Sequence, residues 1–196
     1  QNVKVSGDIK ALGANRNNFD LKQVNGDNAA TTENDKLAAG ATFARVKIDA
    51  DLTDNVSTTI RLLNERLWGA DAANQTNGDS GIDVDLANVT MKEFLYSPLT
   101  LSVGRQELRY GNGLIIGDPD SNITSYSALG TQTIAGANLR DLSLRKSFDS
   151  VKAILDYNPL VVDMFFARPT NDVVSRNGKT DIYGLNLRYD TGIKNT

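Results

Sequence analysis

The chain has 196 residues, of which 40% are hydrophobic and 23% charged, with a formal net charge of -3 and an isoelectric point near 5.0. This balance excludes a strongly basic nucleic-acid-binding protein and a disordered acidic tail, and it favours a folded chain. The sequence has no cysteine and no histidine, which removes disulfides, thiol catalysis, Cys-type zinc sites and the Ser-His-Asp machinery. We therefore predict that the protein is not an enzyme and carries no cofactor.

The sequence contains no run of about 18 apolar residues, so a transmembrane helix is excluded. Membrane β-strands are different, because each needs only about 10 residues of alternating character. The chain begins at Gln1 rather than at methionine, which we interpret as processing of an exported protein.

Alternation of apolar and polar residues with a period of two predicts eight β-strands. The first strand has Val3, Val5 and Ile9 on one face and Lys4 and Asp8 on the other. In chain order, the predicted strands cover residues 3–11, 42–52, 56–68, 82–94, 99–110, 148–157, 160–168 and 181–190.

Two predicted strands contain a break in this alternation. In the fourth strand the apolar positions shift by one residue after Leu86, which indicates a β-bulge. In the fifth strand the face of Val103 would continue into Arg105. We therefore expect a bulge at Gly104 that turns this charge inward. Two residues would then face outward: Leu108 and Tyr110.

Tight turns and long polar loops alternate along the chain. The long loops are predicted at residues 13–40, 70–81, 111–146 and 169–179, and a short extra strand is predicted at 139–144. This rhythm is typical of outer-membrane barrels, which have short periplasmic turns and long extracellular loops. Residues 1–196 would then form a single β-barrel domain or the N-terminal part of one.

The positions of the aromatic residues help to separate a membrane barrel from a soluble β-sandwich, which also alternates. Membrane strands carry aromatic girdles at both interfaces, whereas a soluble core places large rings centrally. Aromatic residues are concentrated at the strand ends here. Those expected at the loop ends are Phe43, Trp68, Tyr110, Phe148, Phe166 and Tyr183, and those at the turn ends are Phe94, Tyr96, Tyr157 and Tyr189. We predict an antiparallel transmembrane β-barrel with lipid as its partner.

Three segments resemble the alginate-export family of outer-membrane β-barrels and related bacterial porins. They are RLLNERLWG at 61–69, VGRQELRYGNG at 103–113 and RKSFDSVKAILDY at 145–157, and the resemblance extends from about Phe43 to Tyr189. It implies a Gram-negative outer-membrane location and a barrel of about 16–18 strands. Since the chain ends at Thr196 without the terminal aromatic strand of such barrels, we expect that it is the N-terminal half.

Charged residues on one face of the predicted strands are candidates for lining a pore. Positive and negative charges nearly balance, so a general or weakly selective channel is favoured over strong selectivity for a polyanion. The alternative is that these charges only pair across strands and stiffen the wall. The predicted pore-lining residues are Lys4, Arg45, Lys47, Asp49, Arg61, Glu65, Lys92, Arg105, Lys152, Asp156 and Arg188.

A cluster of mixed charges falls at the loop end of the third and fifth strands. Because its signs alternate, we favour an inter-strand ion-pair network over a constriction site. Its members are Arg61, Glu65, Arg66, Arg105, Glu107 and Arg109.

The glycine-rich segment at 111–117 lacks the spacing of a nucleotide-binding loop. The following residues Asp118, Asp120 and Asn122 resemble the start of a calcium loop, but the glycine and distal glutamate of an EF-hand are missing. An ordinary turn is favoured over a calcium site there.

The expected function is therefore a passive outer-membrane channel for small hydrophilic solutes or polysaccharide, narrowed by the loop at 111–146. The alternative is a structural or adhesive barrel that does not conduct. A second copy of the chain or an envelope protein is a candidate partner, and no nucleic acid is expected.

Overall fold

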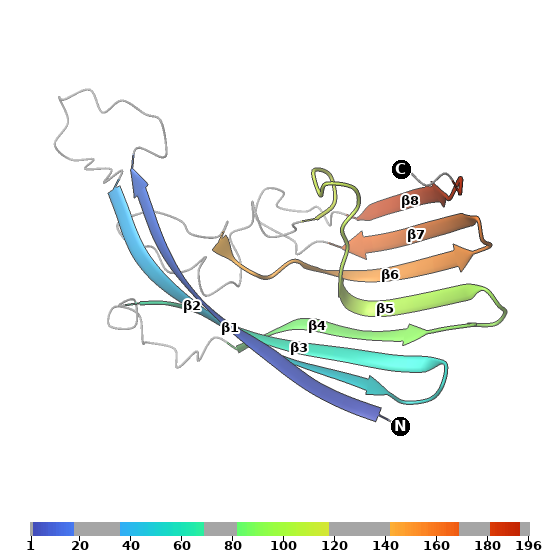
Figure 1. Ribbon diagram of the computed structural model, residues 1–196, viewed down its shortest axis with the longest axis horizontal. Helices are drawn as coiled ribbons and strands as arrows, with labels where there is room; N and C mark the ends of the chain where they lie inside the picture. The colour runs from blue at the N-terminus through green and yellow to red at the C-terminus, as the bar shows by residue number, and fades with distance from the viewer. Residues whose placement is uncertain (1, 18–35, 69–81, 118–141, 169–180, 193–196) are drawn as a thin grey trace.

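The computed structural model describes residues 2–17, 36–68, 82–117, 142–168 and 181–192. They form one antiparallel sheet whose eight strands follow one another in chain order (Figure 1). The prediction of an all-β fold with eight antiparallel strands is confirmed. The strands are β1 (Asn2–Asn17), β2 (Lys36–Asp51), β3 (Val56–Leu67), β4 (Ile82–Met91), β5 (Leu99–Glu107), β6 (Ser147–Asp156), β7 (Leu160–Arg168) and β8 (Ile182–Tyr189).

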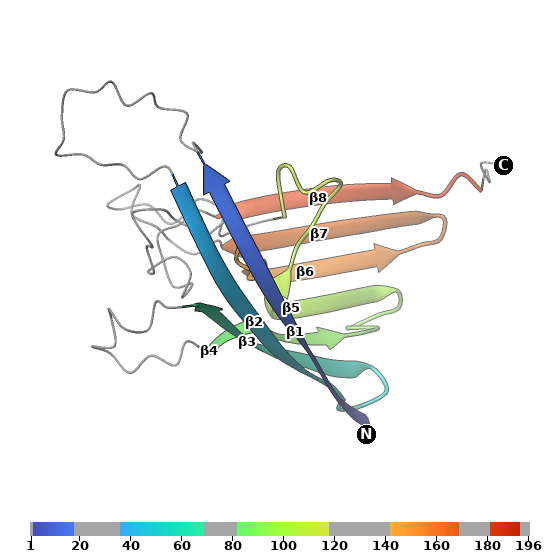
Figure 2. The same ribbon diagram turned by 60° about the vertical axis from the view of Figure 1, so that its left-hand side comes forward.

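The sheet is open. In the described part of the chain β1 pairs only with β2 and β8 pairs only with β7, so these two strands form the edges (Figures 1 and 2). The alternative of a closed eight-stranded barrel is therefore wrong. Among the described residues there is also no helix with the length and apolar character needed to cross a membrane.

The strand ends differ most from prediction between β1 and β2. Their pairing continues to Asn17↔Lys36, so both strands extend into the predicted loop at 13–40. Residues 142–144 of the predicted extra strand are not a strand, and 139–141 lie outside the described residues. The short connections are confirmed, with hydrogen bonds such as Leu52 N to Val56 O at 2.9 Å. We call this end of the sheet the turn end and the opposite one the loop end.

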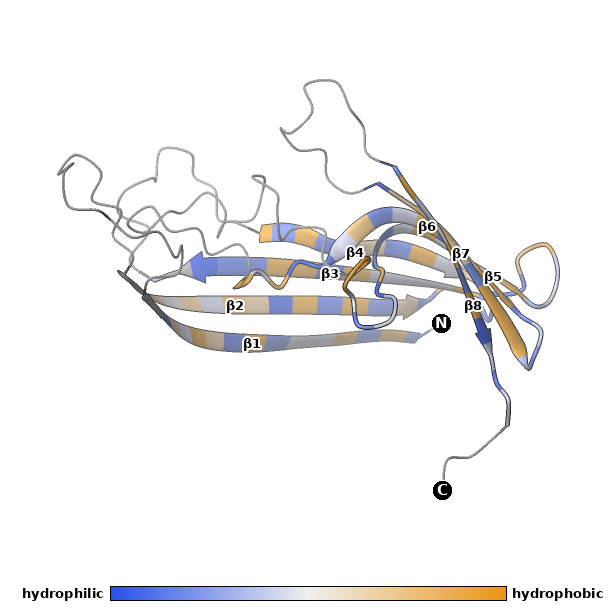
Figure 3. Cartoon of the chain, turned by 90° about the horizontal axis from the view of Figure 1, so that it is seen from above, coloured by the Kyte–Doolittle hydropathy of each residue, from blue (hydrophilic) through white to orange (hydrophobic). Residues whose placement is uncertain are grey.

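The two faces of the sheet differ in chemical character. Cross-strand pairing keeps aliphatic and aromatic positions aligned across all eight strands, and the alternation is visible along β1 and β2 (Figure 3). One row on what we call the apolar face consists of Val3, Ala50, Thr58, Val89, Val103, Val151, Phe166 and Tyr183. The opposite face, which we call the polar face, carries most of the strand charges.

The β-bulge predicted in the fourth strand is confirmed. Arg61 is opposite Leu86 and Leu62 is opposite Val84, so Asp85 is the extra residue of β4. A bulge places two successive side chains on the same side of the strand. Asp85 and Leu86 are accordingly both buried, and the apolar alternation of β4 stays in phase with its neighbours on either side of them.

The bulge predicted at Gly104 is wrong. The register between β5 and β6 runs without a shift from Leu99↔Leu155 to Glu107↔Ser147. Arg105 therefore shares the apolar face with Val103, because its position in the register follows the strand alternation. Gly104 itself has a φ of 120°, and a Cβ there would lie 2.2 Å from the Ala87 carbonyl oxygen. The glycine allows close approach of β4 rather than a bulge.

The buried cluster at the loop end corrects a second prediction. Leu108 packs with Phe148, Phe165 and Ala167, and Tyr110 packs against them from the partly buried rim. Leu108 and Tyr110 thus lie with side chains of the polar face instead of facing outward. Phe43, at 0% exposed, and Phe148 are also buried and do not belong to an exposed girdle. Trp68 and Tyr183 do remain exposed at the loop end.

Candidate functional site

The polar face is the candidate site because it carries most of the residues predicted to line a pore. The strand register places eight of them there: Lys4, Arg45, Lys47, Asp49, Arg61, Glu65, Lys152 and Arg188. Asp156 ends β6 on this face, and its Oδ1 accepts a hydrogen bond from Asn158 N at 3.1 Å. Lys92 lies in the β4–β5 turn, where its N donates to Asn55 O at 2.8 Å. Arg105 is the exception, on the apolar face.

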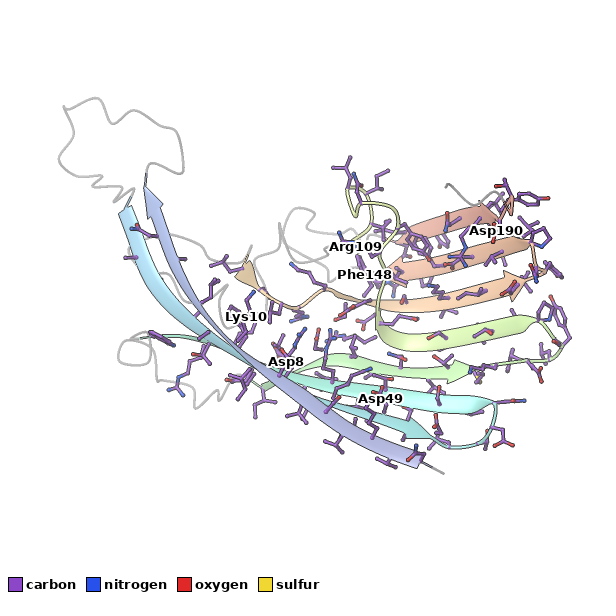
Figure 4. All side chains as sticks on the ribbon, in the orientation of Figure 1. Asp8, Lys10, Asp49, Arg109, Phe148 and Asp190 are labelled. Atoms are coloured by element: carbon purple, nitrogen blue, oxygen red, sulfur yellow. The ribbon has the colours of Figure 1, made fainter. Side chains whose placement is uncertain are left out.

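Charges on β1 and β2 pair across and along the strands. Arg45 contacts both carboxylate oxygens of Asp8 at 2.9–3.2 Å, and Lys47 Nζ lies 2.9 Å from Asp49 Oδ1. The same Asp49 oxygen accepts a 2.7 Å hydrogen bond from the Thr59 hydroxyl. Asp8 and Asp49 are labelled on their strands in Figure 4. These pairs are partly exposed, so each contributes little to the stability of the sheet.

A buried ion pair lies at the bulge of β4. Arg61 Nε donates to Asp85 Oδ2 at 2.5 Å, and Asp85 is fully buried. Arg61 also contacts Glu107 of β5, which is one contact between members of the predicted ion-pair network. Ser147 Oγ lies 3.4 Å from Asp85 Oδ1. The bulge is what brings the Asp85 carboxylate to this face, next to Arg61.

The pairing between β4 and β5 ends near this ion pair. In the described residues it runs only from Met91↔Leu101 to Ala87↔Arg105, although β4 continues back to Ile82. Beyond Glu107 the chain turns toward the buried cluster of Leu108. The two strands therefore part at the loop end, and we call this place the β4–β5 seam.

Residues 142–147 lead into β6 and cover part of the seam. We call this segment the strap. Ser143 Oγ lies 3.0 and 3.1 Å from the two carboxylate oxygens of Glu65, and Leu144 N donates to Glu65 Oε1 at 2.7 Å. Arg145 Nη1 lies 3.7 Å from Asp83 Oδ2. Glu65 is only 5% exposed, so the strap removes this predicted pore-lining carboxylate from solvent.

An aromatic group lies beside β6 and β7 on the same face. The rings of Tyr110 and Phe165 stack with centroids 4.8 Å apart, and Lys152 Nζ lies 5.6 Å from the Tyr110 ring and 3.3 Å from Asp163 Oδ2. Phe148, labelled in Figure 4, belongs to the cluster beneath them. Burial first, and then the Asp163 carboxylate, raise the pKa of Tyr110 above its ordinary value. The Tyr110 hydroxyl and Asp163 Oδ1 nevertheless have no hydrogen bond of ordinary geometry within the described residues.

A row of alternating charges crosses the apolar face at the loop end of β5–β8. Arg105 contacts the Asp149 carboxylate at 2.9 and 3.3 Å, and Arg168 contacts Asp181 at 2.7 and 3.1 Å. Asp149 is directly opposite both arginines in the register. Sequence alternation gave no sign of this row, because only the long-range pairing of strands brings its members together.

Among the described residues no group of three or more Asp or Glu side chains is arranged to hold a metal ion. The residues considered for calcium, Asp118, Asp120 and Asn122, lie outside the described part of the chain. Away from the apolar cluster of Leu108, Phe148 and Phe165 at the loop end, the polar face carries ion pairs, hydroxyls and amides, which suit contact with water and polar solutes.

No protein-family model, no curated protein and no solved structure matches this chain.

Proposed function

We propose that this sheet is part of the wall of a transmembrane β-barrel in a bacterial outer membrane, which gives hydrophilic solutes a passive path. The apolar face would contact lipid and the polar face would line the path. The same assignment follows from the resemblance to alginate-export porins, which implies a barrel of about 16–18 strands.

The observation that carries the proposal is the inverted burial of the two faces. Aliphatic side chains on the apolar face are open, with Val5 66% and Leu185 63% exposed, whereas two carboxylates on the polar face are enclosed, Asp85 at 0% and Glu65 at 5% exposed. A soluble sheet protein buries its aliphatic face and leaves its charges in water. Lipid is the environment that suits the reverse arrangement.

The open edges support closure by further strands. Backbone N–H and C=O groups exposed to hydrocarbon each cost several kcal/mol, so a sheet spans a membrane only when its edges are paired. Within the described sheet the outer edge of β1 is unpaired along a strand of 16 residues. Soluble proteins keep exposed edge strands short or protect them with prolines or bulges. A larger barrel would pair both edges.

The balance of charge favours a weakly selective path. Most of the cations on the polar face are paired with a neighbouring acid, as for Arg45 with Asp8 and Lys152 with Asp163. Such pairs leave little net field to select anions or cations. Small neutral or weakly charged hydrophilic solutes, including sugars, are therefore the proposed substrates.

A structural barrel that does not conduct is the second candidate. The observation in its favour is the filling of the polar face at the loop end by Leu108, Phe148 and Phe165, because side chains packed on this face take up space that a solute path would need.

Single-channel recording separates the two functions. The purified full-length protein would be refolded in detergent and inserted into planar bilayers, with a heat-denatured sample as the control. Discrete conductance steps with a ratio of cation to anion permeability of about one support the channel, because paired charges select weakly. Stable insertion without steps would reject the channel and leave the structural barrel.

A further inference from the structure

The strap meets the sheet through a regular series of contacts. Its alternate side chains Ser143, Arg145 and Ser147 are all buried. Each of them contacts a different acidic residue of β3 or β4, in the order Glu65, Asp83 and Asp85. An extended segment points every second side chain the same way, so the whole strap lies with one face against these acids.

These contacts fall where the wall is interrupted. β5 is not paired with residues 82–86 of β4 in the described part of the chain, and the strap continues from the β6 end of the Glu107↔Ser147 pair. The acids that the strap contacts are on the β3 and β4 side of the seam. The strap thus joins the two sides through side chains where strand pairing has stopped.

Glu65 is the strongest of the three anchors. Its carboxylate accepts from one backbone N–H and one hydroxyl at 2.7–3.1 Å, and hydrogen bonds to a charged acceptor are about twice as strong as neutral ones. The contact of Arg145 with Asp83, at 3.7 Å, and that of Ser147 with Asp85, at 3.4 Å, are longer. Loss of the Glu65 carboxylate would therefore release the strap at its far end.

We propose that the strap is a latch, anchored at Glu65, that closes the β4–β5 seam on the polar face and sets the width of the solute path at that level. The latching itself does not depend on conduction, whereas the effect on width rests on the proposed channel function. The two parts have separate tests.

Cross-linking tests the latch. Because the sequence has no cysteine, the paired variants Asp83→Cys with Arg145→Cys, which leave the Glu65 anchor intact, can be treated with a short bifunctional thiol reagent in the folded protein. Adding Glu65→Ala to this pair should lower its bridging, because the anchor is then lost. The control pair is Ser57→Cys with Arg145→Cys, since Asp83 is opposite Leu63 and Ser57 is on the same face of β3 but about 20 Å further along the strand at about 3.3 Å per residue. Efficient bridging of the first pair only is expected. Equal bridging of both pairs, or of neither, would overturn the latch.

Conductance tests the width. Glu65→Ala is expected to give larger unit conductance than the unaltered chain, and Glu65→Gln, which keeps one acceptor oxygen, an intermediate value. Asp54→Ala, the same type of change in the β2–β3 turn, serves as the control. Bridging the Asp83→Cys and Arg145→Cys pair in the Glu65→Ala protein should prevent this increase.

The outcomes distinguish this inference from the proposed function. If the unaltered chain conducts but Glu65→Ala and the bridged pair leave its conductance unchanged, the strap does not set the width and that part of the inference is wrong. If the unaltered chain inserts without conducting, the channel function fails. Cross-linking then still decides whether the strap is latched at Glu65.

Discussion

The Phe165 ring lies against the backbone of Gly184 on the neighbouring strand, where a Cβ would come within 2.0 Å of the ring. The two residues are directly opposite in the β7–β8 register, and the ring also stacks on Tyr110. Gly184 is thus required by packing, because only a residue without a side chain leaves room for the ring.

Gly184→Ala should therefore destabilise the fold by roughly 1–3 kcal/mol, the usual cost of overpacking. The measurement is the urea midpoint of unfolding in detergent. Gly13→Ala is the control, since a Cβ there has nothing within 4 Å. In a Phe165→Leu background the cost of Gly184→Ala should fall, and an unchanged cost would show that the ring is not the cause.

Arginine on the apolar face should be far more costly than on the polar face. Leu185→Arg is expected to reduce stability in bilayers by about 2–4 kcal/mol if the residue is near the midplane. Asn186→Arg is the matched control, because Asn186 is the next residue, is exposed and is opposite Asp163. Unfolding titrations in lipid vesicles give both values, and equal costs for the two variants would refute the assignment of faces.

The buried Arg61–Asp85 pair should be sensitive to loss of one partner. Asp85→Ala leaves the Arg61 guanidinium buried with one acid fewer, which should cost roughly 3 kcal/mol. Asp8→Ala, which breaks the more exposed pair with Arg45, should cost about 1 kcal/mol or less. The double variant Arg61→Met with Asp85→Leu should recover much of the loss in chemical unfolding experiments. Equal effects of Asp85→Ala and Asp8→Ala would contradict the burial of the first pair.

Tyr110 makes the loop end sensitive to alkaline pH. Its pKa is raised in the folded protein by burial and by Asp163, so the folded state holds this proton more tightly than the unfolded state. The resulting stability is complete below the ordinary tyrosine pKa of about 10 and decreases as the pH rises above it. Between about pH 9 and about pH 12, on either side of that pKa, the stability of the Tyr110→Phe variant should decrease less steeply than that of the unaltered protein. At pH 7 the substitution should hardly change the free energy of unfolding, since the hydroxyl has no partner of ordinary geometry among the described residues.

The sequence predicts well what depends on neighbouring residues. Strand number, the tight turns and the presence of a bulge in the fourth strand follow from the period of two and from one change of phase. The bulge lies at Asp85, just before the predicted change of phase at Leu86. The strand extensions of β1 and β2 were missed because residues 13–17 and 38–40 are mostly small or polar and carry no apolar alternation.

What depends on distant parts of the chain was not predictable. The inward position of Leu108 follows from its packing with Phe148 and Phe165, and the contact of Ser143 with Glu65 joins residues 78 positions apart. The sequence predicts that Arg105 is on the polar face, because a charge is expected to need a polar environment. The structure places it on the apolar face. Pairing with Asp149 and contact with the Val84 carbonyl oxygen at 3.0 Å provide such an environment there.

In the proposed arrangement the apolar face contacts lipid and the polar face contacts water. Adjacent residues Leu187 and Arg188 are both exposed and point to opposite faces, and the chain has no cysteine of its own. Leu187→Cys and Arg188→Cys, each carrying a fluorophore, would be reconstituted in bilayers and exposed to quenchers on the lipid chains or in water. The account predicts quenching from lipid at position 187 and from water at position 188, and quenching of both from water alone would contradict it.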